Sequence, residues 1–204
     1  MALRQFFPTL VHEGHSLDAD LVNDLEAACW MVEDGDQAGH AWCESEGYPG
    51  YTSYASLDDL PKRAPAFADL AKRLAHESER FAEALHWDMM GKRLVLSGLW
   101  VNILGEGMGH SGHLHPGSVI SGTAYVKMPT GAGALKLEDP RLGLMMAAPP
   151  QADDAPEALR RFVYLRPSAG EIVMWESWLR HEVMPSACEE ARISVSFNFA
   201  LEHA

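Results

Sequence analysis

Three of the ten histidines in this 204-residue chain lie within one short Gly-rich segment, residues 109–117. Two of them, His113 and His115, form an H-x-H pair. On an extended backbone, alternate side chains point to the same side, so both imidazoles can reach one metal ion while Leu114 points away. Imidazole is a good ligand for Fe, Zn, Cu and Ni. The pair therefore predicts a metal site that needs a third ligand from another part of the chain.

His181 is the candidate for that third ligand. It follows the apolar run Ile172–Leu179, and an antiparallel barrel would bring the end of that run back across its mouth. Three protein ligands would leave open positions at the metal for chemistry. A second interpretation stays open, in which the H-x-H pair is solvated or hydrogen-bonded in a Gly-rich loop. Six further histidines are interpreted as structural or surface residues: His12, His15, His40, His76, His86 and His203.

Two other motifs in the same region lack the context that they require. Residues 107–112 match the dinucleotide-binding pattern G-x-G-x-x-G, but Pro116 and Gly117 follow, so no helix opens there. Residues 109–113 lack the final glycine of the nucleophile elbow G-x-S-x-G. The sequence contains no Walker loop and no H-E-x-x-H motif. Metal chemistry is therefore the interpretation that this region favours.

The first half of the chain has a helical pattern. Apolar residues recur mostly at three- and four-residue steps over residues 21–32, which predicts a helix capped by Ser16 and ending near Gly35. Residues 47–51 predict a turn, and a second helical pattern runs over residues 67–85. We therefore expect two amphipathic helices before any strand.

The second half has the composition of β-strands. Its runs rich in Val, Ile, Tyr, Phe and Trp are bounded by Gly and Pro. Helices followed by strands predict an α+β, mainly β protein, in which the helices cover one face of an antiparallel sheet or double sheet. A jelly-roll barrel or sandwich fits this order best. The expected strands are residues 93–104, 118–128, 133–138, 161–166, 171–178 and 190–201.

The last expected strand has two chemically different faces. With a period of two residues, one face is apolar and the other carries Arg192, Ser194, Ser196 and Asn198. We expect the apolar face to pack against the helices. The polar face is expected to line an enclosed polar cavity or, in the alternative, to be half exposed to solvent.

Composition limits the function classes. The chain has 16 Lys and Arg against 29 Asp and Glu, a formal net charge of −13, which disfavours a nucleic-acid binder because such proteins need a basic surface. No apolar stretch approaches the roughly 18 residues of a membrane span, and we expect no secretory signal. The cysteines lack C-x-x-C spacing and are expected to be reduced. We therefore expect one cytoplasmic domain over residues 1–204, mostly helical in 1–90.

Several segments, taken in order along the chain, carry a resemblance to a known family: Tyr51-Thr52-Ser53-Tyr54, His113-Leu114-His115-Pro116-Gly117-Ser118, residues 121–126 with Pro129, Glu138-Asp139-Pro140-Arg141, residues 170–181 and residues 192–198. They resemble a bacterial and phage branch of the 2-oxoglutarate- and iron(II)-dependent oxygenases. The resemblance covers most of residues 50–200. It implies a double-stranded β-helix, a cupin-like jelly roll, as the core in residues 91–204, with the N-terminal helices packed on one sheet.

The resemblance also implies a set of ligands. In this family a His, a carboxylate two residues later and a distal His hold Fe(II), and an Arg that follows the distal His binds 2-oxoglutarate. Carried over, His113 and His181 are metal ligands, and Arg192 with Ser194 anchors 2-oxoglutarate. His115 stands where the family has the carboxylate. Three neutral imidazoles would leave the Fe(II) site with two positive charges, which the 2-oxoglutarate dianion would neutralise.

Further residues are candidates for the same site. Glu138 or Asp139 could supply a carboxylate from a neighbouring strand, and His110 could replace one histidine of the pair. Tyr125 and Asn102 lie on strands expected to face inward and are candidate hydrogen-bond partners of 2-oxoglutarate. The alternative for Tyr125 is an aromatic residue of the core.

The implied function is that of a dioxygenase that hydroxylates an unknown small-molecule or protein substrate while 2-oxoglutarate is decarboxylated to succinate. Two alternatives stay open: a three-His dioxygenase that uses no oxoacid, and a non-catalytic metal-binding jelly roll. Residues 142–160 predict either a lid over the substrate or a plain surface loop. The sequence does not predict the oligomeric state.

Overall fold

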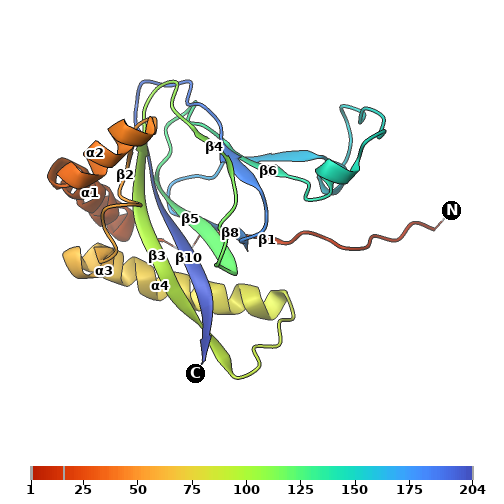
Figure 1. The fold of residues 1–204 in the computed structure, drawn as a ribbon, viewed down its shortest axis with the longest axis horizontal. Coiled ribbons are helices and arrows are strands. Elements are labelled where there is room, and N and C mark those ends of the chain that lie inside the picture. Colours follow the sequence, from red (N-terminus) through yellow and green to blue (C-terminus); the bar gives the residue numbers. More distant parts are fainter. Residues whose placement is uncertain (1, 16, 204) are drawn as a thin grey trace.

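Two antiparallel sheets face each other in the computed structural model of the chain, which describes residues 2–15 and 17–203 (Figure 1). The strands are β1 Val11–His15, β2 Tyr51–Thr52, β3 Lys92–Leu104, β4 His110–His113, β5 Ile120–Lys127, β6 Leu135–Glu138, β7 Phe162–Leu165, β8 Glu171–Glu176, β9 His181–Val183 and β10 Arg192–His203. The larger sheet has six strands in the order β1-β8-β5-β10-β3-β2, and the smaller has four in the order β4-β9-β6-β7. The prediction of a mainly β protein with antiparallel sheets is confirmed.

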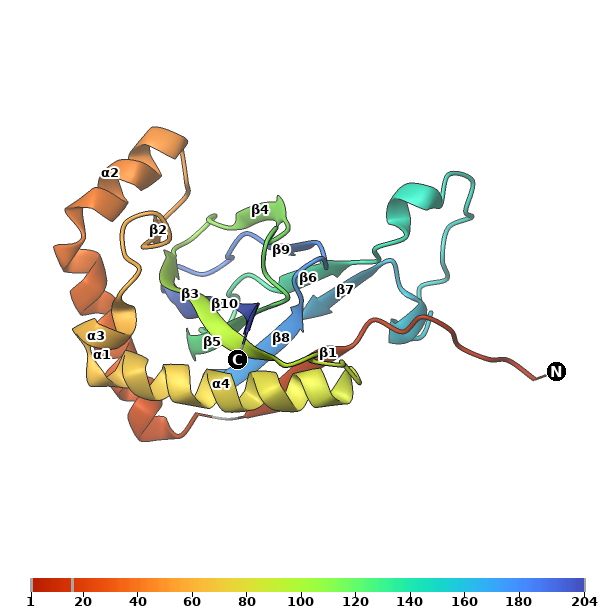
Figure 2. The same ribbon diagram turned by 60° about the horizontal axis from the view of Figure 1, so that its bottom comes forward.

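Helices cover the outer face of the six-stranded sheet (Figure 2). They are α1 Ala19–Gly35, α2 Gln37–Glu46, α3 Leu60–Arg63 and α4 Pro65–Ala84. Leu25 of α1 and Phe67 of α4 share one apolar core with Val101 of β3 and Phe197 of β10. The expected packing of N-terminal helices on one sheet is therefore confirmed. Among the described residues, no helix is both long enough and apolar enough to cross a membrane.

The start of α1 differs from the prediction. Its N-cap is Asp18, whose Oδ1 accepts a hydrogen bond from the Leu21 N–H at 3.0 Å, and Ser16 lies outside the described residues. The helix ends at Gly35 as predicted. The following helix, α2, was not predicted. The side chain of Asp36 caps it by accepting a hydrogen bond from the Gly39 N–H at 2.9 Å.

All six expected strands are present, each within two residues of its predicted ends. The strands that the sequence pattern missed are β1, β2, β4 and β9, which have two to five residues each. Strands β2 and β9 have too few residues for an apolar alternation to be recognised, and β1 (VHEGH) and β4 (HSGH) consist mostly of His, Gly and polar residues. Because β1 precedes α1, the expectation that two helices come before any strand is wrong.

The two faces of β10 have the environments that its alternation predicts. Ile193 and Val195 belong to the core under the helices. Arg192, Ser194 and Ser196 face the space between the two sheets and line a cavity there. The prediction of a polar cavity is therefore confirmed for Arg192, Ser194 and Ser196, whereas Asn198 is half-buried and does not line the cavity.

Gly122 of β5 has no room for a side chain. An added Cβ atom would collide with the ring of Phe197 and lie 2.5 Å from the carbonyl oxygen of Val173. We therefore expect Gly122→Ala to lower the free energy of unfolding by about 1–3 kcal/mol, as measured by urea denaturation. Gly35→Ala is the control because nothing lies within 4 Å of its added Cβ. Equal stability of the Gly122→Ala variant and the unsubstituted protein would contradict this packing.

Candidate active site

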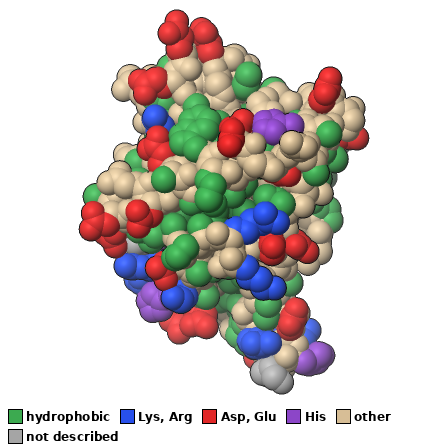
Figure 3. Space-filling model, turned by 90° about the vertical axis from the view of Figure 1, so that its left-hand side faces the viewer, with side chains coloured by type: hydrophobic (Ala, Val, Ile, Leu, Met, Phe, Trp, Pro, Cys, Tyr) green, Lys and Arg blue, Asp and Glu red, His purple; other side chains and the backbone are tan. Residues whose placement is uncertain are grey.

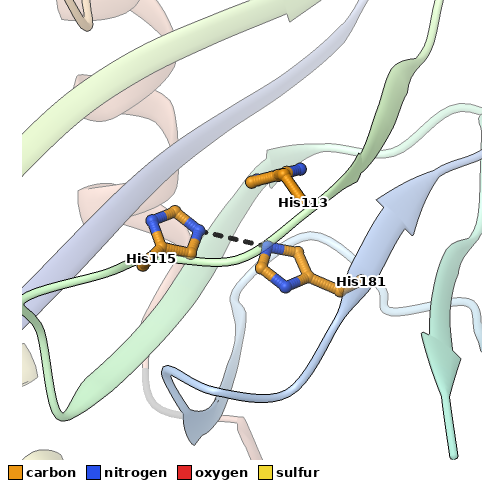
Figure 4. Close-up of side chains that lie close together, drawn as sticks. All are labelled: His113, His115 and His181. Carbon is orange, nitrogen blue, oxygen red and sulfur yellow. Dashed lines mark hydrogen bonds between the residues drawn. The ribbon is translucent and has the colours of Figure 1, made fainter. Parts of the chain in front are cut away.

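Three histidines converge at one end of the smaller sheet (Figure 4). His113 is the last residue of β4, His181 is the first residue of β9, and the two residues are paired across these strands. His115 follows β4 by two residues. One ring nitrogen from each of the three imidazoles lies within 4.8 Å of the others. The structure therefore brings together the three predicted metal ligands from two separate parts of the chain.

The position of His181 in the fold differs from the prediction. It begins β9 of the smaller sheet and does not end the strand that starts at Glu171. Strand β8 stops at Glu176, and the chain then turns and crosses from one sheet to the other. The crossing explains how an apolar strand of the larger sheet delivers a ligand to the opposite sheet.

Backbone carbonyl groups fix the tautomers of two imidazoles. Nδ1 of His113 lies 2.8 Å from the carbonyl oxygen of Ser111, and Nδ1 of His181 lies 2.9 Å from that of Leu179. A carbonyl oxygen only accepts, so each Nδ1 carries the proton and each Nε2 keeps a free lone pair. A hydrogen bond of this kind orients a metal-binding histidine.

The distance between two of these nitrogens also fits a metal ion. Nε2 of His115 and Nε2 of His181 are 3.2 Å apart. Two nitrogen ligands that bind one ion at about 2.1 Å and at a right angle lie about 3 Å from each other. The donor set and its spacing therefore suit a divalent transition metal.

Burial keeps these imidazoles neutral. Burial, with a smaller contribution from the charge of neighbouring histidines, lowers the pKa of His115 to about 4 and that of His181 to about 3. The pKa of His113 is also lowered, mainly by burial. At neutral pH the three rings are therefore unprotonated, which is the state that binds metal.

These pKa values predict the acid sensitivity of the metal-free protein. An unfolded histidine titrates near pH 6.5 and the folded His181 near pH 3, so the unfolded chain binds more protons between these values. The contribution of the neutral, buried histidine to the free energy of unfolding is therefore fully present above pH 6.5. It is lost progressively as the pH falls toward 3. We expect urea denaturation to show a smaller free energy of unfolding at pH 5 than at pH 7. His181→Gln should weaken that dependence, and an unchanged dependence would contradict the assignment.

The alternative ligands are engaged elsewhere. Glu138 lies 3.4 Å from Arg180 in an ion pair, and Asp139 lies 2.8 Å from Arg141. His110 stacks on His113 with ring centroids 4.1 Å apart, but it is outside the cluster of three convergent nitrogens. The geometry therefore favours the three predicted histidines over the alternatives that the sequence left open.

Behind the imidazoles lies a cavity of about 220 Å³ between the two sheets. Arg192, on its inner side, is only 2% exposed. Its Nη1 donates a hydrogen bond to Oγ of Ser194 at 3.0 Å, and its Cζ lies 5.3 Å from the ring centroid of Tyr125.

Arg192 has no ion-pair partner within the described part of the chain, and its Nε has no hydrogen-bond partner there. Burial lowers the pKa of the guanidinium, yet an arginine stays charged at neutral pH. A buried charge without a counter-ion is unfavourable. This residue therefore points to an anionic ligand in the cavity.

Asn102 and Tyr125 occupy different positions relative to this cavity. Asn102 lines it and donates a hydrogen bond from Nδ2 to Oγ of Ser196 at 3.0 Å. Tyr125 is completely buried in a small apolar cluster between the sheets and does not line the cavity. Burial raises the pKa of Tyr125 to about 12. Its buried position matches a core aromatic residue, but its hydroxyl has no hydrogen-bond partner among the described residues, so the alternative of a core tyrosine with a satisfied hydroxyl is not met. The guanidinium of Arg192 lies above its ring.

Residues 142–160 do not cover the site. They contain two short 3-10 turns, η1 Leu142–Leu144 and η2 Glu157–Leu159, and extend away from the sheets (Figure 1). None of the residues that line the cavity comes from this segment. In this structure the segment is a surface loop, and the lid interpretation is not supported.

The outer part of the cavity contains aromatic residues to which the sequence analysis gave no role: Trp42, Tyr48 and Trp100. The ring of Tyr48 meets that of His110 edge-on, with centroids 5.2 Å apart, and its hydroxyl has no hydrogen-bond partner within the described residues. Burial raises the pKa of Tyr48 to about 12, so it remains a donor. Nothing in the local sequence distinguishes these residues from core aromatics, because the cavity arises only when α2 and the sheets meet.

The sequence from β3 to β10 belongs to a known family. Residues 98–198 match the sequence model of a family described as "Putative 2OG-Fe(II) oxygenase". This segment contains the three convergent histidines and Arg192. Through it the chain is a member of the 2-oxoglutarate- and Fe(II)-dependent oxygenases, a family of enzymes.

Solved structures share the fold. A prolyl-4-hydroxylase from Pseudomonas putida is 17% identical over 94% of this chain and 92% of its own, with a TM-score of 0.61. The epimerase SnoN, in complex with Fe3+, alpha ketoglutarate and nogalamycin RO, is 16% identical over 95% of this chain and 79% of its own, with a TM-score of 0.63. HygX from Streptomyces hygroscopicus, with nickel and 2-oxoglutarate bound, is 14% identical over 95% and 83%, with a TM-score of 0.59. No curated protein shows a significant sequence match.

Proposed function

We propose that this chain is an Fe(II)- and 2-oxoglutarate-dependent dioxygenase that hydroxylates a C–H bond of a small-molecule or protein substrate. One observation carries the proposal. A single cavity contains three convergent neutral imidazoles and a buried guanidinium that has no carboxylate partner among the described residues. A divalent metal fits the imidazoles, and a dicarboxylate fits the guanidinium.

In this proposal His113, His115 and His181 hold Fe(II), and Arg192 binds the far carboxylate of 2-oxoglutarate. A guanidinium can donate two parallel hydrogen bonds to a carboxylate, and Ser194 holds the guanidinium in place. When bound, Fe(II) and 2-oxoglutarate supply the oxidising chemistry: O2 is consumed, 2-oxoglutarate becomes succinate and CO2, and one oxygen atom enters a substrate C–H bond. The complexes of SnoN and HygX with a metal and 2-oxoglutarate support this assignment.

The remaining polar side chains of the cavity orient the bound dicarboxylate. The hydroxyl of Ser196 links Asn102 and Thr123, with distances of 3.0 Å and 3.1 Å. In this row one N–H of the Asn102 amide is used, and its second N–H is a donor for a carboxylate oxygen of the ligand. The guanidinium of Arg192 packs over the aromatic ring of Tyr125.

We extend the proposal to the fold. The two facing sheets correspond to the double-stranded β-helix, the cupin-like jelly roll, of this family, and their larger sheet shares one core with the helices. That shared core supports a single domain over residues 1–204.

Oxygen uptake tests the proposed function. With Fe(II) and 2-oxoglutarate supplied, we expect slow uptake of O2 and one succinate formed per 2-oxoglutarate consumed, even without substrate, and a faster rate with the correct substrate. Succinate is measured by chromatography. If the Fe(II)-loaded protein forms no succinate under any substrate mixture, the proposal is wrong.

One feature favours a second candidate function. Position 115 is a histidine, and three-His iron sites can serve dioxygenases that bind their substrate directly and use no oxoacid. In that case oxygen uptake would be independent of 2-oxoglutarate, and Arg192 would have only a structural role.

A further inference from the structure

We propose that the substrate of this site is a basic segment of a polypeptide. One of its side chains would enter the cavity through an aromatic opening, while flanking Lys or Arg residues contact acidic side chains around that opening. The proposal rests on the proposed function for the chemistry inside the cavity. The binding surface itself can be tested without turnover.

Three of the aromatic residues that line the cavity are Trp42, Tyr54 and Trp100, of which Tyr54 is the most exposed. We call these three residues the aromatic mouth. The ring of Tyr54 meets that of Trp100 edge-on at 5.2 Å, and it lies 6.5 Å from that of Trp42. Trp100 in turn lies 5.9 Å from the ring of His115. Aromatic surface therefore runs without a break from the solvent to the candidate metal ligands.

Tyr54 shows that this surface is not part of the core. It is 60% exposed, although its ring contacts those of Trp42 and Trp100. Exposed aromatic side chains at the edge of a cavity are typical of binding sites. They can bind an apolar group, and their faces also attract Lys and Arg side chains.

The size of the cavity favours a partner that inserts only one side chain. Its volume of about 220 Å³ is below the roughly 300–1,000 Å³ of a typical small-molecule pocket, and 2-oxoglutarate would occupy the part next to Arg192. The space that is left accommodates a side chain. The rest of the substrate must then lie outside, across the aromatic mouth.

The surface around the mouth is acidic. Residues 5–61 contain twelve Asp and Glu residues and no Lys or Arg, so this segment accounts for nearly all of the net charge of −13. It forms β1, α1, α2 and one wall of the mouth. Figure 3 shows the face that carries these helices, where most of the visible Lys and Arg side chains lie in the lower half of the view.

Three of these acidic residues lie close in sequence to the mouth: Glu44 and Glu46, two and four residues after Trp42 on α2, and Asp58, four residues after Tyr54. All three are exposed, and none forms an ion pair with another described residue. Unpaired charges of one sign around a binding site select partners of the opposite sign and accelerate their association.

The acidic segment extends over a greater distance than a small cation can span. Helix α1 has 17 residues, about 25 Å at 1.5 Å per residue. It carries exposed Asp34 three and four residues after exposed Met31 and Trp30. Asp24, nearer the start of the helix, instead lines a groove that also contains Lys72 and Arg73. A polyamine would reach only the mouth. A polypeptide with several basic residues can contact both the mouth and α1, and for that reason we favour a polypeptide.

Binding of synthetic peptides tests the proposal without turnover. The probes are three mixtures of labelled nonapeptides with randomised central positions, flanked by Lys, by Ser or by Glu residues. Fluorescence anisotropy measures their affinity for the full chain, with and without Fe(II) and 2-oxoglutarate in the absence of O2. We expect the Lys-flanked mixture to bind at least about 10-fold tighter than the Ser-flanked mixture at low salt, and this advantage should shrink at high salt.

Charge variants show whether the mouth is responsible. The triple variant Glu44→Gln, Glu46→Gln, Asp58→Asn is expected to reduce the Lys advantage below about 3-fold. The matched control neutralises three exposed acidic residues of the distant loop 142–160, Asp153→Asn, Asp154→Asn and Glu157→Gln, and is expected to keep the full advantage. Trp42→Ala should weaken the binding of both the Lys- and the Ser-flanked mixtures.

Three results would overturn the proposal. The first is equal affinity for Lys- and Ser-flanked peptides. The second is an equal loss of the Lys advantage in the mouth variant and the control. The third is complete displacement of the Lys-flanked peptides by spermidine, added at a concentration of positive charge equal to that of the peptide. This result would identify a small polyamine as the ligand. Because none of these readouts needs succinate formation, a failed oxygenase assay and a failed peptide assay are distinguishable.

Discussion

Arg192→Ala is expected to lower the affinity for 2-oxoglutarate by at least about 100-fold, because the variant removes a fully buried partner of a charged ligand. Binding of Fe(II) should be unchanged, since the guanidinium belongs to the inner side of the cavity and not to the cluster of imidazoles. Isothermal titration under anaerobic conditions measures both affinities. Arg192→Lys should recover part of the loss, because a lysine supplies the charge but not two parallel hydrogen bonds.

The stability of a different variant, Arg192→Met, provides an independent readout. Without 2-oxoglutarate, Arg192 is a buried charge with no ion-pair partner among the described residues, so replacing it with Met should leave the free energy of unfolding unchanged or raise it. The unsubstituted protein should gain stability on addition of 2-oxoglutarate with metal, and the Arg192→Met variant should not. Full turnover by Arg192→Ala would favour the three-His dioxygenase that uses no oxoacid.

His181→Ala is expected to lower the affinity for Fe(II) by more than about 100-fold. Substitutions of residues that only orient a metal ligand already cost 10- to 100-fold, and His181 would be a ligand itself. It is 5% exposed and its tautomer is fixed by Leu179, so no neighbouring side chain can easily take its place. Equilibrium dialysis followed by elemental analysis measures the affinity.

Matched variants test whether the ligand set is correct. His110→Ala removes a histidine that stacks on His113 but lies outside the cluster, so we expect at most a small loss of Fe(II) affinity. Glu138→Gln and Asp139→Asn should have little effect, because these carboxylates pair with arginines. If either carboxylate variant lost as much affinity as His181→Ala, the metal would have a carboxylate ligand and the three-His assignment would be wrong.

The sequence predicted the long elements because each has a clear period. The alternation in β10 separates Ile193 and Val195 from Arg192 and Ser194, and the structure places the two groups on opposite sides of the sheet. The helical period of α4 likewise matches its buried residues. In β10 and α4 the sequence pattern agrees with the tertiary packing, so the pattern is sufficient to predict these elements and the faces that they bury.

Other parts of the fold and site depend on tertiary contacts that no local pattern reports. The short strands β4 and β9 exist because they pair with each other and place His113 opposite His181. The N-cap of α1 is Asp18, whose side-chain oxygen accepts a hydrogen bond from the N–H of Leu21. Both Asp and Ser are preferred N-cap residues, so residue type alone did not distinguish Asp18 from the predicted cap, Ser16. Tyr125 faces inward as predicted, but the second sheet encloses it in a core cluster away from the cavity.

The aromatic mouth was missed for the same reason. Trp42 lies on α2, a helix that the sequence pattern did not predict, and Trp100 lies in a strand whose other apolar residues belong to the core. Only the assembled fold shows that both residues line the cavity.

Anaerobic titration of the Fe(II)-loaded protein with 2-oxoglutarate tests the central proposal most directly. If the three imidazoles bind Fe(II) and Arg192 anchors the dicarboxylate beside it, a weak visible charge-transfer band will rise and saturate as 2-oxoglutarate is added. The band should be absent in His181→Ala and should require far more 2-oxoglutarate in Arg192→Ala. A protein that binds Fe(II) tightly but gives no band at saturating 2-oxoglutarate would contradict the proposed function.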